Sequence, residues 1–183
     1  MAEVETERLL LRMFRPDDLD ALAILFSNPK VMRYVGDGQP ASREEADKAL
    51  QSIINHWASH GFGRWAAVDK HTHEFVGFGG LRSLFGVPEV VYHFAPEHWG
   101  KGLATELARA SLRFGFETHG FERIVAIAKP GNAASIHVME KLGMKYQQHT
   151  SYYNIDVVEY SIARDQFRPG DAAYLLKDSV AQS

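Results

Sequence analysis

PEHWGKGLATELARA, residues 96–110, is the stretch of sequence that decides the fold. The residues before it are rich in Val, Tyr and Phe, which is typical of a strand that ends at Ala95. Gly100 and Gly102 permit a tight turn, and the leucines and alanines that follow recur at helical spacing. The first turn of a helix leaves backbone N–H groups unpaired and carries a partial positive charge. The spacing therefore predicts an anion site where this helix begins.

The patterns on either side of this turn predict a mixed α/β fold. Upstream, two amphipathic helices follow a first strand, and three consecutive strands lead into the turn. Consecutive strands pair antiparallel, whereas a strand–helix–strand unit pairs parallel. We therefore expect a mixed, mostly antiparallel sheet of about seven strands with helices on both faces. The predicted strands are 9–14, 63–68, 75–84, 88–95, 123–128, 146–153 and 157–163, and helices begin near Pro16, Ser42, Leu103 and Asn132.

Domain organisation is predicted to be simple. No internal repeat, low-complexity tract or linker interrupts residues 1–167, which we interpret as a single domain. Residues 168–183 have no clear period and are expected to form a loosely docked tail.

Composition excludes several classes of protein. With 20 Lys and Arg against 23 Asp and Glu, the chain lacks the basic surplus that nucleic-acid binding needs. Cysteine is absent, so disulfides, thiolate metal sites and a covalent Cys intermediate are excluded. His71 and His73 lie in a predicted hairpin turn without a third ligand, so we expect no metal site. The opening MAEVETERLL is not a secretory signal and no apolar run could span a membrane, so a cytoplasmic location is expected.

The order of these elements, with its motifs, closely resembles the GNAT acetyltransferase family. The resemblance covers residues 6–167 and rests on WGKGLAT (99–105), NAAS (132–135) and EKLG (140–143). It implies a GNAT-like fold and transfer of an acetyl group from acetyl-CoA to a primary amine. The phrases ETERLLLRMFRPDD and APEHWGKGLATE look most like the branch of Rim-type ribosomal-protein N-terminal acetyltransferases, which also holds small-molecule enzymes. The acceptor, a protein N-terminus or a small-molecule amine, stays open, and the resemblance suggests a homodimer.

The resemblance also implies the residues that bind the cofactor. The family's pyrophosphate motif, [QR]-x-x-G-x-[GA], is matched by Gly102 and Ala104, while Trp99 stands where Gln or Arg is usual. Backbone groups before the turn would bind pantetheine, and the Asn132 amide would join them, although Asn132 could instead, or also, cap a helix. The expected cofactor-binding residues are Phe94, Ala95, Trp99, Gly100, Lys101, Gly102, Leu103, Ala104, Thr105, Asn132 and Ser135.

The reaction requires a base, because a free amine with a pKa near ~10 is mostly protonated at neutral pH. Glu89 and His93 lie on one face of the predicted strand and are the candidates, with an exposed edge acid and a core histidine as the alternatives. Many relatives carry a tyrosine acid seven residues after the asparagine, but Met139 occupies that position. Ser135 is the substitute that we predict, although a serine in the first helical turn also serves as a plain cap. The Phe94 N–H would polarise the thioester carbonyl by the same resemblance.

Two other functions are compatible with the sequence. Met139 would suit a non-catalytic acyl-CoA-binding or regulatory module, and the same layers could form a scaffold for protein partners that uses no CoA. On the last hairpin, Glu159 faces either the acceptor amine or solvent.

Overall fold

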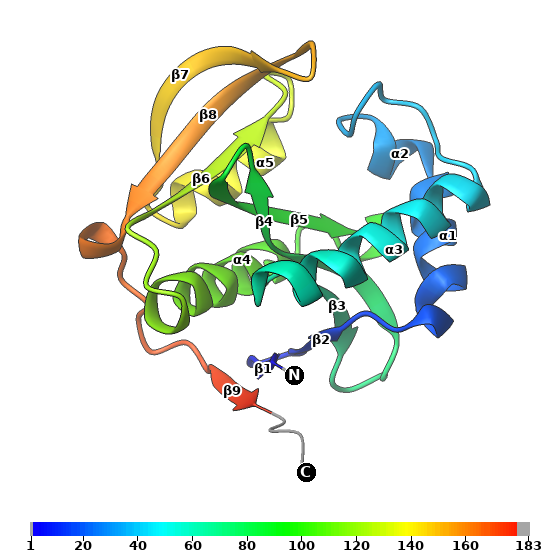
Figure 1. Cartoon of the computed structure of the whole chain (residues 1–183), viewed down its shortest axis with the longest axis horizontal. Helices are drawn as coiled ribbons and strands as arrows, with labels where there is room; N and C mark the ends of the chain where they lie inside the picture. The colour runs from blue at the N-terminus through cyan, green and yellow to red at the C-terminus, as the bar shows by residue number, and fades with distance from the viewer. Residues whose placement is uncertain (1, 179–183) are drawn as a thin grey trace.

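The computed structural model describes residues 2–178, which form one nine-stranded sheet with helices packed against it (Figure 1). The strand order is β7-β8-β6-β5-β4-β3-β2-β1-β9. The strands are β1 Ala2–Glu5, β2 Leu9–Met13, β3 Arg64–Asp69, β4 Phe75–Leu84, β5 Val87–Phe94, β6 Arg123–Ala128, β7 Lys145–Tyr152, β8 Ile155–Ala163 and β9 Leu175–Asp178. The helices are α1 Leu19–Ser27, α2 Pro29–Met32, α3 Arg43–His60, α4 Leu103–Arg113 and α5 Ala133–Lys141.

The helices cover both faces of the sheet. On one face, Phe78 of β4 contacts Phe26 of α1, with ring centroids 5.7 Å apart. The next residue, Gly79, points to the other face, where an added Cβ would lie 2.5 Å from Leu107 of α4. A glycine here lets α4 pack directly onto the strands. The predicted two-sided architecture is confirmed.

Strands β5 and β6 are the parallel neighbours in the sheet, and α4 connects them. Their register contains a single pair, Glu89 with Val125, whereas β4 and β5 pair from Gly77–Phe94 to Leu84–Val87. β5 and β6 therefore diverge toward the carboxyl end of β5, just before the glycine turn.

The local signals at α3 explain its limits. Ser42 and Glu45 form a reciprocal capping box at its start, which agrees with the helix predicted to begin near Ser42. At its end Gly61 adopts a left-handed conformation with φ 72°. Ala46, Leu50, Ile53 and Trp57 form its buried stripe.

The sheet has two more strands than the expected seven. β1 lies before the first predicted strand, and β9 pairs with it, with Val4 opposite Leu176. The expectation of a loosely docked tail was therefore wrong for Leu175–Asp178; residues 179–183 lie outside the described part of the chain. Both strands have four residues, too few for a periodic pattern, and they pair across almost the whole chain.

The last hairpin turns one residue earlier than expected. The predicted turn was 154–156, but Tyr153 and Asn154 form it with φ angles of 53° and 61°. Asn commonly adopts this conformation, whereas Tyr rarely does, so the sequence favoured a later turn. Across residues 2–178, no helix is long and apolar enough to cross a membrane.

Candidate active site

Helix α4 begins without a side-chain cap. Gly100 and Gly102 have φ angles of 72° and 79°, which glycine adopts without strain. Gly102 precedes the helix, and none of the described side chains caps its first turn. The first helical bond joins the Glu106 N–H to the Gly102 carbonyl at 3.0 Å, so the preceding N–H groups lack helical partners. These donors and the helix dipole form a site for an anionic group.

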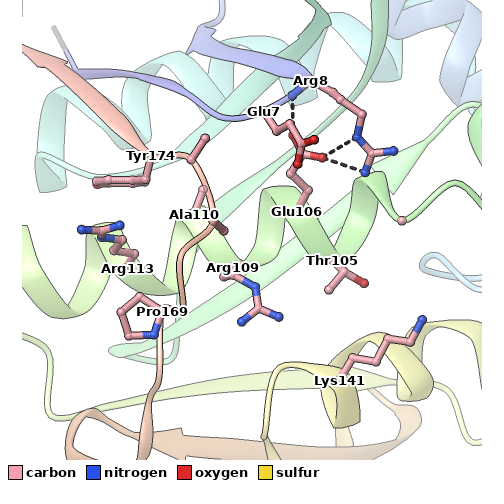
Figure 2. A pocket seen from close by; sticks show the side chains of 13 residues that line it. Glu7, Arg8, Thr105, Glu106, Arg109, Ala110, Arg113, Lys141, Pro169 and Tyr174 are labelled. Carbon is pink, nitrogen blue, oxygen red and sulfur yellow. Dashed lines mark hydrogen bonds and ion pairs between the residues drawn. The ribbon is translucent and has the colours of Figure 1, made fainter.

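A network around Glu106 holds this turn in place. The carboxylate accepts hydrogen bonds from the Thr6 hydroxyl at 2.6 Å, the Arg8 N–H at 2.8 Å and the Arg8 Nε at 2.7 Å. The Arg8 Nη1 donates to the Lys101 carbonyl at 2.7 Å, inside the glycine turn. The β1–β2 turn therefore holds the glycine turn in place, and Figure 2 shows the interactions between Arg8 and Glu106.

A cavity of about 300 Å³ continues from the glycine turn along α4. Figure 2 shows Thr105 and Arg109 on the side of α4 that faces Lys141 of α5. Arg109 contacts the Arg168 carbonyl at 3.5 Å, and neither it nor Lys141 forms an ion pair within residues 2–178. The lining also contains Glu7, Glu106 and two arginines that are paired with acids, Arg8 and Arg113, so Arg109 and Lys141 are the cations of this lining that make no ion pair within that part of the chain.

Hydrogen bonds already engage most of the backbone expected to bind pantetheine. The Ala95 N–H donates to the Val76 carbonyl at 3.0 Å, and the Ala95 carbonyl accepts from the His98 N–H at 2.9 Å. The Phe94 carbonyl accepts from the Trp99 indole at 2.7 Å. Because antiparallel strands alternate their donors, the Phe94 N–H points away from β4, toward the space where β5 and β6 diverge. It is the backbone donor that remains for a ligand there.

The N-terminus of α5 faces the same divergence. The Asn132 side chain accepts a hydrogen bond from the Ser135 N–H at 3.2 Å, so Asn132 caps the helix. The Tyr92 hydroxyl lies 3.0 Å from the Ser135 carbonyl and 3.1 Å from its hydroxyl. Burial raises the pKa of Tyr92, so it stays protonated. Met139 is buried in the core one turn further along α5.

Glu89 and His93 lie on one face of β5, as predicted, and this is the face opposite to that of Tyr92. Glu89 is 1% exposed, so the alternative of an exposed edge acid is wrong. Burial raises its pKa, while Arg82, which donates from Nε at 2.6 Å, opposes that shift. His93 stacks on Phe78 at 4.8 Å, and burial lowers its pKa to about 4. His93 is therefore neutral at neutral pH.

Glu159 is not a solvated strand residue. Its carboxylate is 4% exposed and accepts hydrogen bonds from Tyr152 at 2.7 Å, Arg123 at 3.2 Å and Gln148 at 3.3 Å. A carboxylate with three donors is already satisfied, which makes it part of the wall rather than a free group.

Comparison with known proteins decides the family. Residues 8–145 match the family model described as "Acetyltransferase (GNAT) domain". The chain belongs to the GNAT acetyltransferase family. The Bacillus subtilis protein named "Uncharacterized N-acetyltransferase YoaA" is 31% identical over 173 residues, covering 88% of this chain and 96% of that protein. This member of the family is thus an acetyl-CoA-dependent N-acetyltransferase.

Solved structures share the fold of this GNAT acetyltransferase. The GNAT-family acetyltransferase from Bacillus anthracis superposes with a TM-score of 0.78 at 27% identity, covering 89% of this chain and 99% of that one. The ribosomal-protein-S5-alanine acetyltransferase from Vibrio fischeri gives 0.72 at 21% identity, covering 91% and 99%. The second likeness concerns the fold alone.

Several residues of this acetyltransferase site were missed by sequence reasoning. Arg8 and Glu106 pair with each other across 98 positions, Arg82 pairs with Glu89 across a strand hairpin, and Tyr92 reaches Ser135 across 43 positions. Strand alternation could have signalled Tyr92, because it places this side chain on the face that α5 covers.

Proposed function

We propose that this acetyltransferase binds acetyl-CoA along the start of α4 and receives its acceptor amine from the opposite face of the sheet. The observation that carries the proposal is the uncapped N-terminus of α4 beside the divergence of β5 from β6. The pyrophosphate would accept hydrogen bonds from the N–H groups of residues 102–105. Pantetheine would follow the divergence, where the Phe94 N–H points.

The cavity beside α4 would take the nucleotide end of the same molecule. It adjoins Gly102 and is lined by Arg109 and Lys141, whose charges attract phosphate. Lys101 is exposed at the rim of the turn and would add a third cation.

Glu89 is our proposed base. The acceptor must lose a proton before its nitrogen attacks the thioester carbon and the C–S bond breaks. Arg82 holds one carboxylate oxygen of Glu89, and the other makes no hydrogen bond within the described residues. His93, with a pKa of about 4, accepts a proton less readily and would shape the pocket beside Glu89. Four residues of strand separate Glu89 from His93 and span ~13 Å, so a water would carry the proton from the acceptor to Glu89.

Ser135 would stabilise the departing thiolate from the α5 side. By analogy with cysteine, that thiol has a pKa near ~8.5, so a hydrogen bond is sufficient help. The Tyr92 hydroxyl donates to the Ser135 carbonyl and lies 3.1 Å from the Ser135 hydroxyl, so it would hold this serine in place beside the sulfur. The pair would replace the tyrosine that is absent at Met139.

Calorimetric titration with acetyl-CoA tests the proposal. We expect the wild type to bind acetyl-CoA and Gly102→Glu, which puts a carboxylate into the anion site, to abolish that binding. Gly86→Glu is the matched control, because Gly86 also has a positive φ, 86°, and open space around it. No binding by the wild type, or equal binding by Gly102→Glu, would contradict the proposal. Binding without turnover of any amine would identify a non-catalytic acyl-CoA-binding module instead.

A further inference from the structure

Two arginines lie side by side on the face of the sheet where the acceptor would bind. Arg64 of β3 pairs with Gly80 of β4, which pairs with Val91 of β5. Residues directly opposite in a sheet share a face, so Arg64 is on the face of Glu89 and His93. Trp65, the next residue, points to the other face and packs on Phe114 at 5.0 Å.

The charges in this cluster do not balance. Arg82 is paired with Glu89, and both arginines act electrostatically on Glu89 and His93. The Arg64 guanidinium makes no hydrogen bond or ion pair with any described residue. Two guanidinium groups therefore share one carboxylate, and His93 is neutral beside them.

Arg64 is also half-buried. Desolvation, with repulsion from Arg82, lowers its pKa to about 10, so it stays charged at neutral pH. A charged group that has lost part of its hydration and shares one carboxylate with another cation is destabilised, and an incoming anion would relieve that cost. The planar fork of guanidinium matches a carboxylate with two parallel hydrogen bonds.

The spacing of the strands limits the length of the ligand that could reach from Arg64 to Glu89. Arg64 is two strands away from β5, so its backbone lies roughly 10 Å from the strand that carries Glu89. An extended arginine side chain covers more than half of that distance, which leaves room for a few bonds between an anion at Arg64 and an amine near Glu89.

We propose that the acceptor is a primary amine that also carries a carboxylate a few bonds from the nitrogen, held by Arg64 with Arg82. The inference rests on the proposed function and narrows its substrate class. Polyamines would place a second cation against the two arginines, and a peptide N-terminus followed by a neutral residue would leave Arg64 without a partner.

Matched acceptors test this inference. Each of a set of α-, β- and γ-amino acids is compared with its own carboxamide and with the amine that lacks the carboxyl group, and spermidine is included. We expect kcat/KM for the acids to exceed that for the carboxamides by ~10- to 100-fold, the usual range for a charge-assisted contact. Carboxamides or spermidine that react as well as the acids would overturn the inference.

Variants assign the preference to the arginine. Arg64→Met should lower kcat/KM for the acid more than for its carboxamide, mainly through a higher KM, and so remove the advantage of the acid. Arg64→Lys keeps the charge and should retain part of the preference. Arg43→Met changes an exposed arginine at the start of α3 and should have no effect. An Arg64→Met protein that keeps its melting temperature but slows all acceptors equally would contradict the assignment.

A binding experiment distinguishes failure of the acceptor inference from failure of the proposed function. Affinities of an acid and its carboxamide are measured calorimetrically on protein saturated with CoA, and the acid should bind at least tenfold more tightly. Equal affinities overturn the acceptor inference while leaving acetyl-CoA binding intact. Failure to bind acetyl-CoA at all overturns the proposed function itself.

Discussion

The N-termini of α3 and α4 meet the same requirement in opposite ways. Both helices begin with N–H groups that have no partner within the helix. In α3, the Ser42 hydroxyl accepts from the Glu45 N–H at 3.3 Å, and the Glu45 carboxylate accepts from the Ser42 N–H at 2.7 Å. In α4, Gly102 offers no side chain, and the first-turn acid Glu106 points away to the β1–β2 turn.

This difference separates a structural helix end from a functional one. The α3 end satisfies its own donors and holds nothing else. The α4 end leaves its donors exposed, and the acid that could have capped it anchors the supporting loop instead. An anion that binds at the α4 end would stabilise the folded protein. Single substitutions at the two ends should therefore separate folding from binding.

The largest effect is expected from Glu106→Ala, which removes the anchor of the α4 turn. Its carboxylate is mostly buried but Arg8 is 44% exposed, so we expect a loss of about 2 kcal/mol in the free energy of unfolding. Acetyl-CoA binding should weaken as well, because Arg8 would no longer hold the Lys101 carbonyl. Urea unfolding and calorimetry measure the two effects; unchanged stability would show that the network is dispensable.

A smaller effect, confined to folding, is expected from Ser42→Ala. Loss of an N-cap hydroxyl should lower stability by about 1 kcal/mol, with acetyl-CoA affinity unchanged. Hydrogen bonds from Ser42 lower the pKa of Glu45. The capping box therefore contributes fully above the unfolded pKa of Glu45 and loses its contribution as pH falls through the lowered folded value. Thermal unfolding at neutral and acidic pH should show a deficit that shrinks in acid; a deficit that grows would contradict this account.

The smallest effect is expected from Arg109→Met or Lys141→Met beside α4. Each removes one partly exposed cation from the cavity, so acetyl-CoA affinity should fall about threefold at low salt and less at high salt. Lys48→Met is the control on α3, where the lysine pairs with Glu44. Calorimetry at two salt concentrations makes the comparison, and equal losses for all three variants would rule out a role for the cavity.

The sequence predicted the elements whose signals are local. α3 has a capping box and an apolar stripe, and β4 and β6 were predicted with their observed limits. β1 and β9 were not predicted because nothing in their own residues marks them as strands. They are strands because they pair with each other, and that pairing joins the two ends of the described chain. Tyr153 in a left-handed turn was missed because the residue type disfavours that conformation.

The residues of the site also divide into those that local sequence patterns predict and those that they do not. Gly102 and Asn132 could be found from the sequence, because a turn before a helix and a cap are short-range patterns. The roles that we propose for Arg64, Arg82 and Tyr92 depend on neighbours across strands or on another helix. A single sequence does not contain those contacts. Burial of Glu89 beside Arg82 excludes the exposed edge acid, which the sequence left open as the alternative to a base.

The indole that closes onto the Phe94 carbonyl gives this enzyme an optical reporter of its own. Trp57 and Trp65 are 6% and 0% exposed, while Trp99 is 49% exposed at the edge of the glycine turn. A dissolved collisional quencher such as iodide would reach Trp99 and spare the other two. The fluorescence of Trp99 therefore follows events at the α4 turn without an added label, on the timescale of a stopped-flow experiment.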